Sequence, residues 1–130
     1  RAGRALLPKR KNFLPVPVRV YLMIDLQTKG LELHMNYNTF IKSIKSSFPL
    51  AELTNPELAM WHAMNDNWNS AHRTAQSIKN ELGAWIHAYL HRIEGDLENA
   101  NYWYRRANRP PSQNTLKDEA EEIIRFITQI

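Results

Sequence analysis

The sequence contains no cysteine, which excludes several kinds of chemistry at once. The protein has no disulfide framework, no thiol nucleophile and no cysteine-based zinc site. A zinc site built from histidine and carboxylate ligands is still compatible with the composition. The lack of cysteine also fits a cytoplasmic location, which is the one we expect.

Long apolar runs are also absent. No stretch of about 18 apolar residues occurs in the chain, so the sequence predicts no transmembrane helix and no membrane partner. The basic N-terminus is interrupted by Pro8, Pro15 and Pro17. It lacks the continuous apolar core and the small-residue cleavage site of a secretory signal, so we do not expect secretion by that route.

The larger part of the chain lacks an excess of positive charge. Residues 1–35 hold seven Lys or Arg against two Asp or Glu, whereas residues 36–130 hold ten against eleven. The net charge of +4 therefore comes from the N-terminal arm. A nucleic-acid-binding domain normally carries its basic residues on the folded surface. We therefore expect that nucleic acid is not the partner.

The pattern of residues divides the chain into an arm, residues 1–35, and a single helical domain, residues 36–130. Within the arm, apolar residues alternate over 16–26 and again over 31–35, with Gly30 between them, which predicts a β-hairpin. Two strands are marginally stable alone, so the hairpin is expected to pack on the domain or pair with a second copy. Alternatively, Met35 is the natural start and residues 1–34 are a non-native extension.

The domain is predicted to be mainly α, with about five to six helices. Its first helix is expected to run from a cap at Asn38 to Pro49, with Phe40 and Phe48 on its apolar face. The sequence TNPE at 54–57 has the capping-box pattern and is expected to open a second helix, 58–64. Further helices are predicted over the ranges 68–78, 81–94, 97–107 and about 115–130.

Two segments repeat at an offset of 29 residues. HAMNDNWNSAH at 62–72 aligns with HRIEGDLENAN at 91–101. In each copy a helix ends in a tight turn, and Asn67 or Asp96 is placed to cap the next helix. Gly95 favours the left-handed backbone conformation of the turn, and Asp66 occupies the equivalent position in the first copy. The repeat predicts antiparallel helical hairpins near 55–78 and 81–108 that stack to bury their apolar faces.

The second hairpin resembles the tetratricopeptide repeat (TPR) family. The similar positions are those of the turn and second helix of that repeat: Gly95, Leu97, Ala100, Tyr104 and Ala107, with proline soon after. The resemblance is best over 84–111 and implies TPR-like hairpins that take part in protein–protein interaction. The signature WIHAYLHR-x-EGDL-x-NA-x-YWYRRA also resembles small uncharacterised bacterial proteins, which implies that residues 36–130 form a complete domain.

His87 and His91 stand where the repeat family has large apolar side chains. Because they lie four residues apart on a predicted helix, their imidazoles point to the same side and can hold one divalent metal ion. The sequence lacks the glutamate of the H-E-x-x-H protease motif. The alternative is that both imidazoles are buried and hydrogen-bonded for structural reasons. The metal hypothesis predicts that His62, His87 and His91 converge within ligand distance of one another. The side chains that are candidates to complete the site are His62, His72, Asp66, Glu94 and Glu98.

We expect a non-catalytic interaction or scaffolding module that self-associates through the arm or an exposed helix face. The sequence contains no nucleophile motif and no glycine-rich phosphate loop, either of which would support an enzymatic activity. The alternative is a small metal- or ligand-dependent activity centred on His87 and His91. Trp103 and Tyr104 are expected to belong to the core. The candidate polar pocket consists of six residues: His62, His72, His87, His91, Tyr102 and Arg105.

Overall fold

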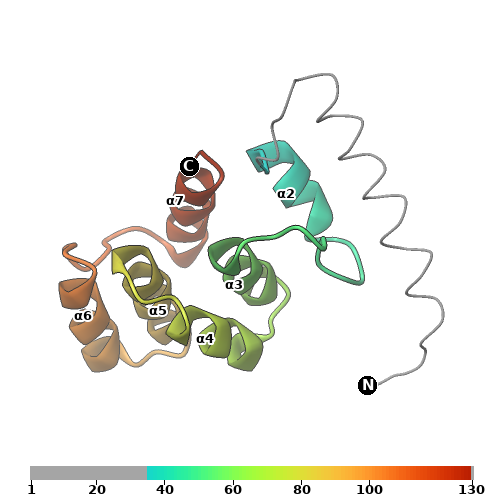
Figure 1. The fold of residues 1–130 in the computed structure, drawn as a ribbon. Coiled ribbons are helices and arrows are strands. Elements are labelled where there is room, and N and C mark those ends of the chain that lie inside the picture. The colour runs from blue at the N-terminus through green and yellow to red at the C-terminus, as the bar shows by residue number, and fades with distance from the viewer. Residues whose placement is uncertain (1–34, 130) are drawn as a thin grey trace. The chain divides into compact units, whose positions relative to one another are not determined.

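The computed structural model describes residues 35–129, and within them the fold is helical, with no strand (Figure 1). Residues 35–49 and 53–129 belong to one compact unit. The predicted mainly α class is thus confirmed for the described part, whereas the predicted β-hairpin of the arm and the question of a non-native extension concern residues outside it. Residues 35–129 form six helices, which are in chain order α2 (Tyr37–Ser43), α3 (Asn55–Met64), α4 (Trp68–Gln76), α5 (Glu81–Ile93), α6 (Leu97–Arg106) and α7 (Leu116–Ile127).

Helix α5 is the centre of the core. Every residue from Gly83 to His91 is buried, and α5 packs against α3, α4, α6 and α7 (Figure 1). Ile86 and Leu90 are fully buried in this helix, and they are joined in the core by side chains from the helices around it. The helix that carries both predicted metal ligands is therefore enclosed by other helices.

The turns of the two predicted hairpins have the same geometry. Asp66 has a φ of 59° and Gly95 a φ of 84°, and both follow the last turn of a helix. The next residue, Asn67 or Asp96, donates its backbone N–H to the carbonyl five residues earlier, at 2.9 and 3.0 Å. The side chains of Asn67 and Asp96 then cap α4 and α6. These bonds satisfy carbonyls that a helix end leaves without a partner.

Helix α2 differs from the prediction at both ends. Its N-cap is Asn36, whose side chain accepts a hydrogen bond from the N–H of Thr39 at 2.8 Å. The predicted cap, Asn38, lies inside the helix, so that prediction was wrong. The helix ends at Ser43 rather than near Pro49. Phe48, predicted on its apolar face, is therefore outside it and 50% exposed.

Helix α3 begins as the capping box predicts, although three residues earlier than Leu58. Thr54 donates its N–H to the carboxylate of Glu57 and accepts a hydrogen bond from the N–H of Glu57. Farther along this helix, the indole of Trp61 donates to the carbonyl of Ser43 at 2.9 Å. This bond attaches the end of α2 to α3.

A buried carboxylate attaches α7 to the centre of the domain. Glu119 is fully buried and accepts hydrogen bonds from the indole of Trp85, the hydroxyl of Tyr104 and the guanidinium of Arg92. Burial and the neighbouring Glu119 raise the pKa of Tyr104, which keeps its hydroxyl protonated as a donor. Buried charges in proteins are usually compensated in this way by ion pairs and hydrogen bonds.

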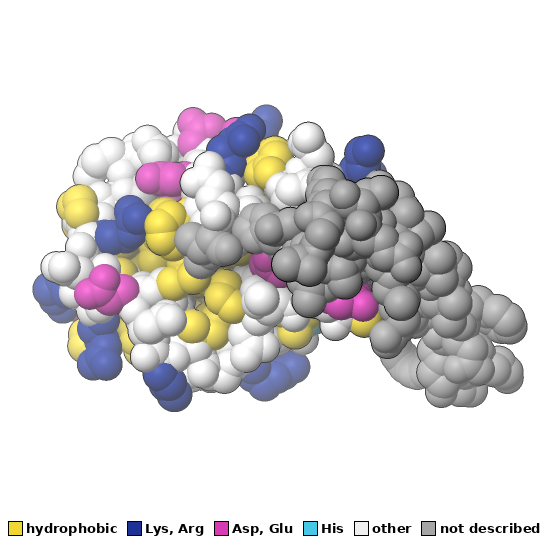
Figure 2. All heavy atoms as spheres, turned by 45° about the horizontal axis from the view of Figure 1, so that its top comes forward, with side chains coloured by type: hydrophobic (Ala, Val, Ile, Leu, Met, Phe, Trp, Pro, Cys, Tyr) yellow, Lys and Arg dark blue, Asp and Glu magenta, His cyan; other side chains and the backbone are white. Residues whose placement is uncertain are grey.

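Charge is dispersed on the face shown in Figure 2. Lys and Arg side chains there are scattered among apolar, acidic and neutral ones and do not gather into a single patch. No helix in the described part of the chain combines the length and apolar character required to cross a membrane.

Candidate metal site between two helical hairpins

Three imidazoles meet where α4 packs against α5. His72 comes from α4, and His87 and His91 come from α5. Each offers one ligand atom, and these three atoms lie within 4.8 Å of one another. His87 and His91 are buried, and His72 is partly exposed. The structure therefore brings the two predicted ligands together with one of the residues predicted to complete the site.

Two indoles hold the imidazole planes. Trp68 stacks on His72 with ring centroids 4.6 Å apart and planes 13° apart. Trp103 stacks on His87 at 3.9 Å and 11°. The rings of His72 and His87 are perpendicular, at 89°, and their Nε2 atoms lie 2.8 Å apart. The imidazoles of His72 and His87 thus each stack on an indole, and each directs its Nε2 at the other.

The indole of Trp68 is itself fixed in place. Its Nε1 donates to the carbonyl of Leu90 on α5 at 2.7 Å. Trp68 also meets the ring of His91 edge-on, with centroids 5.8 Å apart. A single side chain of α4 therefore touches both α5 and the cluster, which limits how far the imidazoles can move apart.

The third imidazole is oriented by a carboxylate. Nδ1 of His91 lies 2.7 Å from a carboxylate oxygen of Glu94, three residues later. When His91 is neutral and Nδ1 carries the proton, Nε2 is left with a lone pair. Metal-binding histidines are commonly held by such a second hydrogen bond, which fixes both the tautomer and the ring orientation.

The environment keeps the other two imidazoles neutral. Burial lowers the pKa of His87 to about 3, and the neighbouring His72 and His91 contribute in the same direction. Burial also lowers the pKa of His72. Neutral imidazoles offer the lone pairs that a metal requires, so no proton must leave these two rings at neutral pH. Without an ion, the 2.8 Å contact is a hydrogen bond in which one Nε2–H donates to the other Nε2.

A second group of candidate ligands shares His91 with the first. It consists of His91, Glu94 and Asp96 at the α5–α6 turn. Its two carboxylates are exposed, and that of Asp96 already accepts the N–H of Asn99 as the cap of α6. Exposed carboxylates are well solvated without a metal, so the buried three-histidine group is the stronger candidate.

His62 does not join the cluster, so the prediction that it converges with His87 and His91 was wrong, although the repeat aligns it with His91. The histidine that joins His87 and His91 is His72 of α4, the helix directly before α5. His62 lies on α3, which precedes α4. Its ring meets Trp61 edge-on, and its Nδ1 is buried without a hydrogen-bond partner among the described residues. Burial, followed by the charge of Arg73, lowers the pKa of His62.

The remaining predicted pocket residues lie on the surface. Tyr102 is 43% exposed and accepts a hydrogen bond from the guanidinium of Arg106, and Arg105 is also exposed. Neither belongs to the group of three histidines. Asp66 and Glu98, the other candidate ligands, are exposed as well and lie outside that group.

Sequence reasoning missed the roles of Trp68 and Trp103. Trp68 precedes His72 by four residues on one helix, a spacing that places both side chains on the same face, so a signal for this pair was present. Trp103 was expected in the core, but it is only partly buried and stacks on His87 of another helix. No pattern within one helix marks that contact.

Comparisons of this chain with protein-family models, curated proteins and solved structures found no match. The resemblances to the TPR family and to the bacterial signature therefore stay predictions, and the function is inferred from the geometry of the described residues.

Proposed function

We propose that the protein binds one divalent transition-metal ion through His72, His87 and His91. The observation that carries this proposal is the convergence of three ligand atoms within 4.8 Å, inside a packed helical interface. Zinc binds imidazole nitrogen at about 2.0–2.1 Å in tetrahedral sites, which separates two ligand nitrogens by about 3.3 Å. The 2.8 Å between Nε2 of His72 and Nε2 of His87 is close to that separation, so a small outward shift admits an ion.

The donor set favours particular metals. Imidazole nitrogen suits Zn²⁺, Co²⁺, Ni²⁺ and Cu²⁺, whereas Mg²⁺ and Ca²⁺ prefer oxygen ligands. Three protein ligands leave the fourth position of a tetrahedral ion open to water or to a small ligand. A non-catalytic binding role and a small metal-dependent activity are both compatible with that open position.

Titration of the metal-free protein with Zn²⁺ and Co²⁺ tests the proposal. Calorimetry should give one Zn²⁺ per chain, and Co²⁺ should produce the visible absorption of a tetrahedral site. We expect His72→Ala and His91→Ala each to weaken binding by more than about tenfold, since each removes a ligand. His62→Ala is the matched control, because His62 is partly buried but lies outside the cluster, and it should bind as the wild type does.

His72→Ala is the most informative variant because His72 is the least buried of the three ligands. Circular dichroism should show that its helix content is unchanged. The proposal fails if the folded wild type binds neither metal, or if His62→Ala loses as much affinity as His72→Ala.

We also propose that the hairpins form a TPR-like interaction module that self-associates. The matched turns at Asp66 and Gly95 support the TPR-like arrangement. A groove of about 560 Å³ supports self-association. It is lined mostly by apolar and aromatic side chains from α2, α3, α4, α5 and α7, among them Tyr37, Tyr89 and Ile124. Burial of apolar surface between two copies removes it from water, which stabilises a dimer.

Light scattering over a range of concentrations tests the second proposal. Ile93 lines the groove and is 38% exposed, whereas Leu97 is 61% exposed and does not line it. We expect the wild type to exceed the mass of a monomer, Ile93→Glu to be monomeric, and Leu97→Glu to behave as the wild type. A monomeric wild type at every concentration would exclude self-association.

A further inference from the structure

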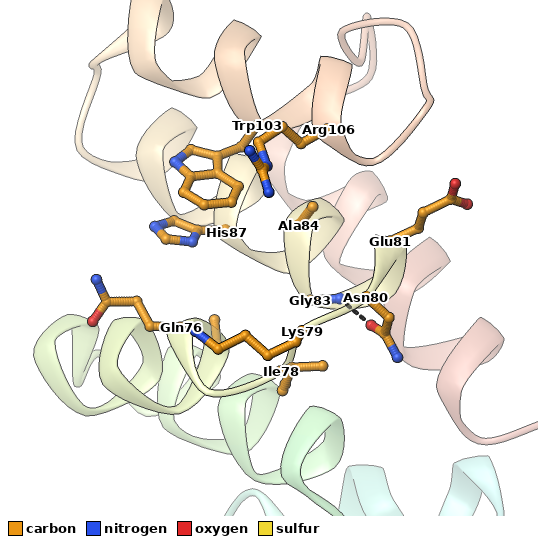
Figure 3. A pocket seen from close by; sticks show the side chains of 11 residues that line it. Gln76, Ile78, Lys79, Asn80, Glu81, Gly83, Ala84, His87, Trp103 and Arg106 are labelled. Carbon is orange, nitrogen blue, oxygen red and sulfur yellow. Dashed lines mark hydrogen bonds between the residues drawn. The ribbon is translucent and has the colours of Figure 1, made fainter.

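A second cavity lies beside the histidine cluster and has the stacked His87 and Trp103 in its lining. It has a volume of about 410 Å³ and is formed by the end of α4, the segment 78–80, the first turns of α5 and the end of α6 (Figure 3). Pockets for small molecules commonly have volumes of about 300–1,000 Å³. The cavity is therefore large enough for a small organic ligand.

The charged side chains at this pocket make it cationic. Lys79 and Arg106 line it from opposite sides, and among the described residues neither forms an ion pair with a carboxylate. Glu81 also lines the pocket, but Figure 3 shows its carboxylate extending away from the other lining side chains. Helix α5 begins here, and its N-terminal end adds partial positive charge.

The guanidinium of Arg106 is held in position without being neutralised. It lies 5.4 Å from the ring centroid of Trp103 and 5.8 Å from that of Tyr102, and it donates one hydrogen bond to the hydroxyl of Tyr102 at 3.3 Å. Figure 3 shows it beside the stacked pair of Trp103 and His87. A guanidinium has five N–H donors, so donors remain for a ligand.

The rest of the lining is mixed. Ala75, Ile78 and Ala84 contribute apolar surface, and the amides of Gln76 and Asn80 contribute hydrogen-bonding groups. The side-chain oxygen of Asn80 accepts the N–H of Gly83 at 2.9 Å, which leaves its NH₂ group as a donor. The polar groups around this pocket are therefore mainly donors, which match an acid group rather than an amine.

We propose that this pocket binds a small organic anion, with its acid group between Lys79 and Arg106 and a short apolar body against Ala75, Ile78 and Ala84. The guanidinium binds a carboxylate through charge-assisted hydrogen bonds, which are stronger than neutral ones. The proposal goes beyond the metal site and does not require an ion, although His87 belongs to both. Tests on metal-free protein therefore separate the two proposals.

Nuclear magnetic resonance titration with hexanoate is the direct test. In the metal-free protein, hexanoate should shift the signals of Gly83, Ala84 and the Trp103 indole, all of which line the pocket. Hexylammonium has the same apolar body and the opposite charge, and it should shift them much less. The proposal is overturned if hexylammonium binds as well as hexanoate, or if hexanoate shifts none of these signals.

Two arginines on α6 give a matched pair of variants. Arg106→Gln removes the cation that lines the pocket and should weaken hexanoate binding by about tenfold, the effect expected for a lost hydrogen bond to a charged group. Arg105→Gln removes the same charge from an exposed neighbour that does not line the pocket, and it should change the affinity by less than about twofold. Equal losses in both variants would show non-specific charge attraction and refute the pocket.

Discussion

The indole of Trp103 on α6 stacks on the imidazole of His87 on α5, with ring centroids 3.9 Å apart and planes 11° apart. This contact fixes the plane of a side chain whose other face points toward the histidine cluster. It also joins the proposed metal site to the proposed anion pocket, since Trp103 and His87 line the latter.

Loss of this stacking should weaken metal binding without abolishing it. We expect Trp103→Leu to reduce zinc affinity by about 10- to 100-fold, because a residue that supports a ligand typically contributes that much. Calorimetric titration measures the change. Asn101→Ala, an exposed position on the same helix, is the control and should leave the affinity unchanged. Wild-type affinity in Trp103→Leu would mean that His87 keeps its orientation without the indole.

Removal of the Glu119 carboxylate should destabilise the domain strongly. Glu119→Ala leaves a guanidinium, an indole and a hydroxyl without their buried acceptor, and breaking a buried ion pair costs about 3–5 kcal/mol. Urea unfolding measures the loss. Glu121→Ala is the matched control on α7, because Glu121 pairs with Arg125 on the surface and such pairs contribute about 0–1 kcal/mol. Similar losses in both variants would contradict a central role for Glu119.

Substitutions of Gly95, in the turn after α5, should change the free energy of unfolding through the backbone conformation alone. A Cβ at Gly95 would have no atom within 4 Å, but its φ of 84° is left-handed. Gly95→Ala should therefore cost about 1–2 kcal/mol. Gly95→Asn should cost less, because asparagine tolerates this region and Asn108 adopts a φ of 59°. The order of the two unfolding free energies is the test, and a more stable alanine variant would refute it.

Acid should lower the stability of the metal-free protein. The pKa values of His62 and His72 are lowered from 6.5 and that of His87 is lowered to about 3, so the unfolded chain binds more protons than the folded one below about pH 6.5. The free energy of unfolding is then highest above that pH and falls as the pH falls toward the folded-state pKa values.

Substitution of one of these histidines tests the cause of the acid effect. His62→Leu removes one group with a lowered pKa and a buried nitrogen without a partner. The loss of stability between about pH 7.5 and pH 5 should therefore be smaller in this variant than in the wild type. Denaturant unfolding at the two pH values measures both losses, and equal losses would exclude His62 as a contributor.

The starts and ends of most helices could be predicted from the sequence, because they depend on capping side chains and turn residues that lie next to one another in the chain. Thr54, Asn67 and Asp96 cap helices as expected, and Gly95 has the left-handed conformation expected of it. The first helix was misjudged because two asparagines compete for its start. Asn36 takes that role, and the apolar spacing through Phe48 does not extend the helix.

The candidate site was only partly predictable, because it depends on which helices pack together. The spacing of His87 and His91 indicated two ligands on one face. The third ligand was expected to be His62, because sequence similarity does not say that α4, and with it His72, packs on the histidine side of α5. The stacking of Trp103 and the burial of Glu119 likewise depend on contacts between helices that lie far apart in the sequence.

Because α5 packs against helices on every side, its backbone amides should be the last in the domain to lose protection against hydrogen exchange. Amides of α5 become accessible only when α3, α4, α6 and α7 separate from it, which amounts to global unfolding. The short helix α2 can open in smaller fluctuations. An ion held by two histidines of α5 would therefore slow exchange throughout the domain by mass action, rather than in a single loop.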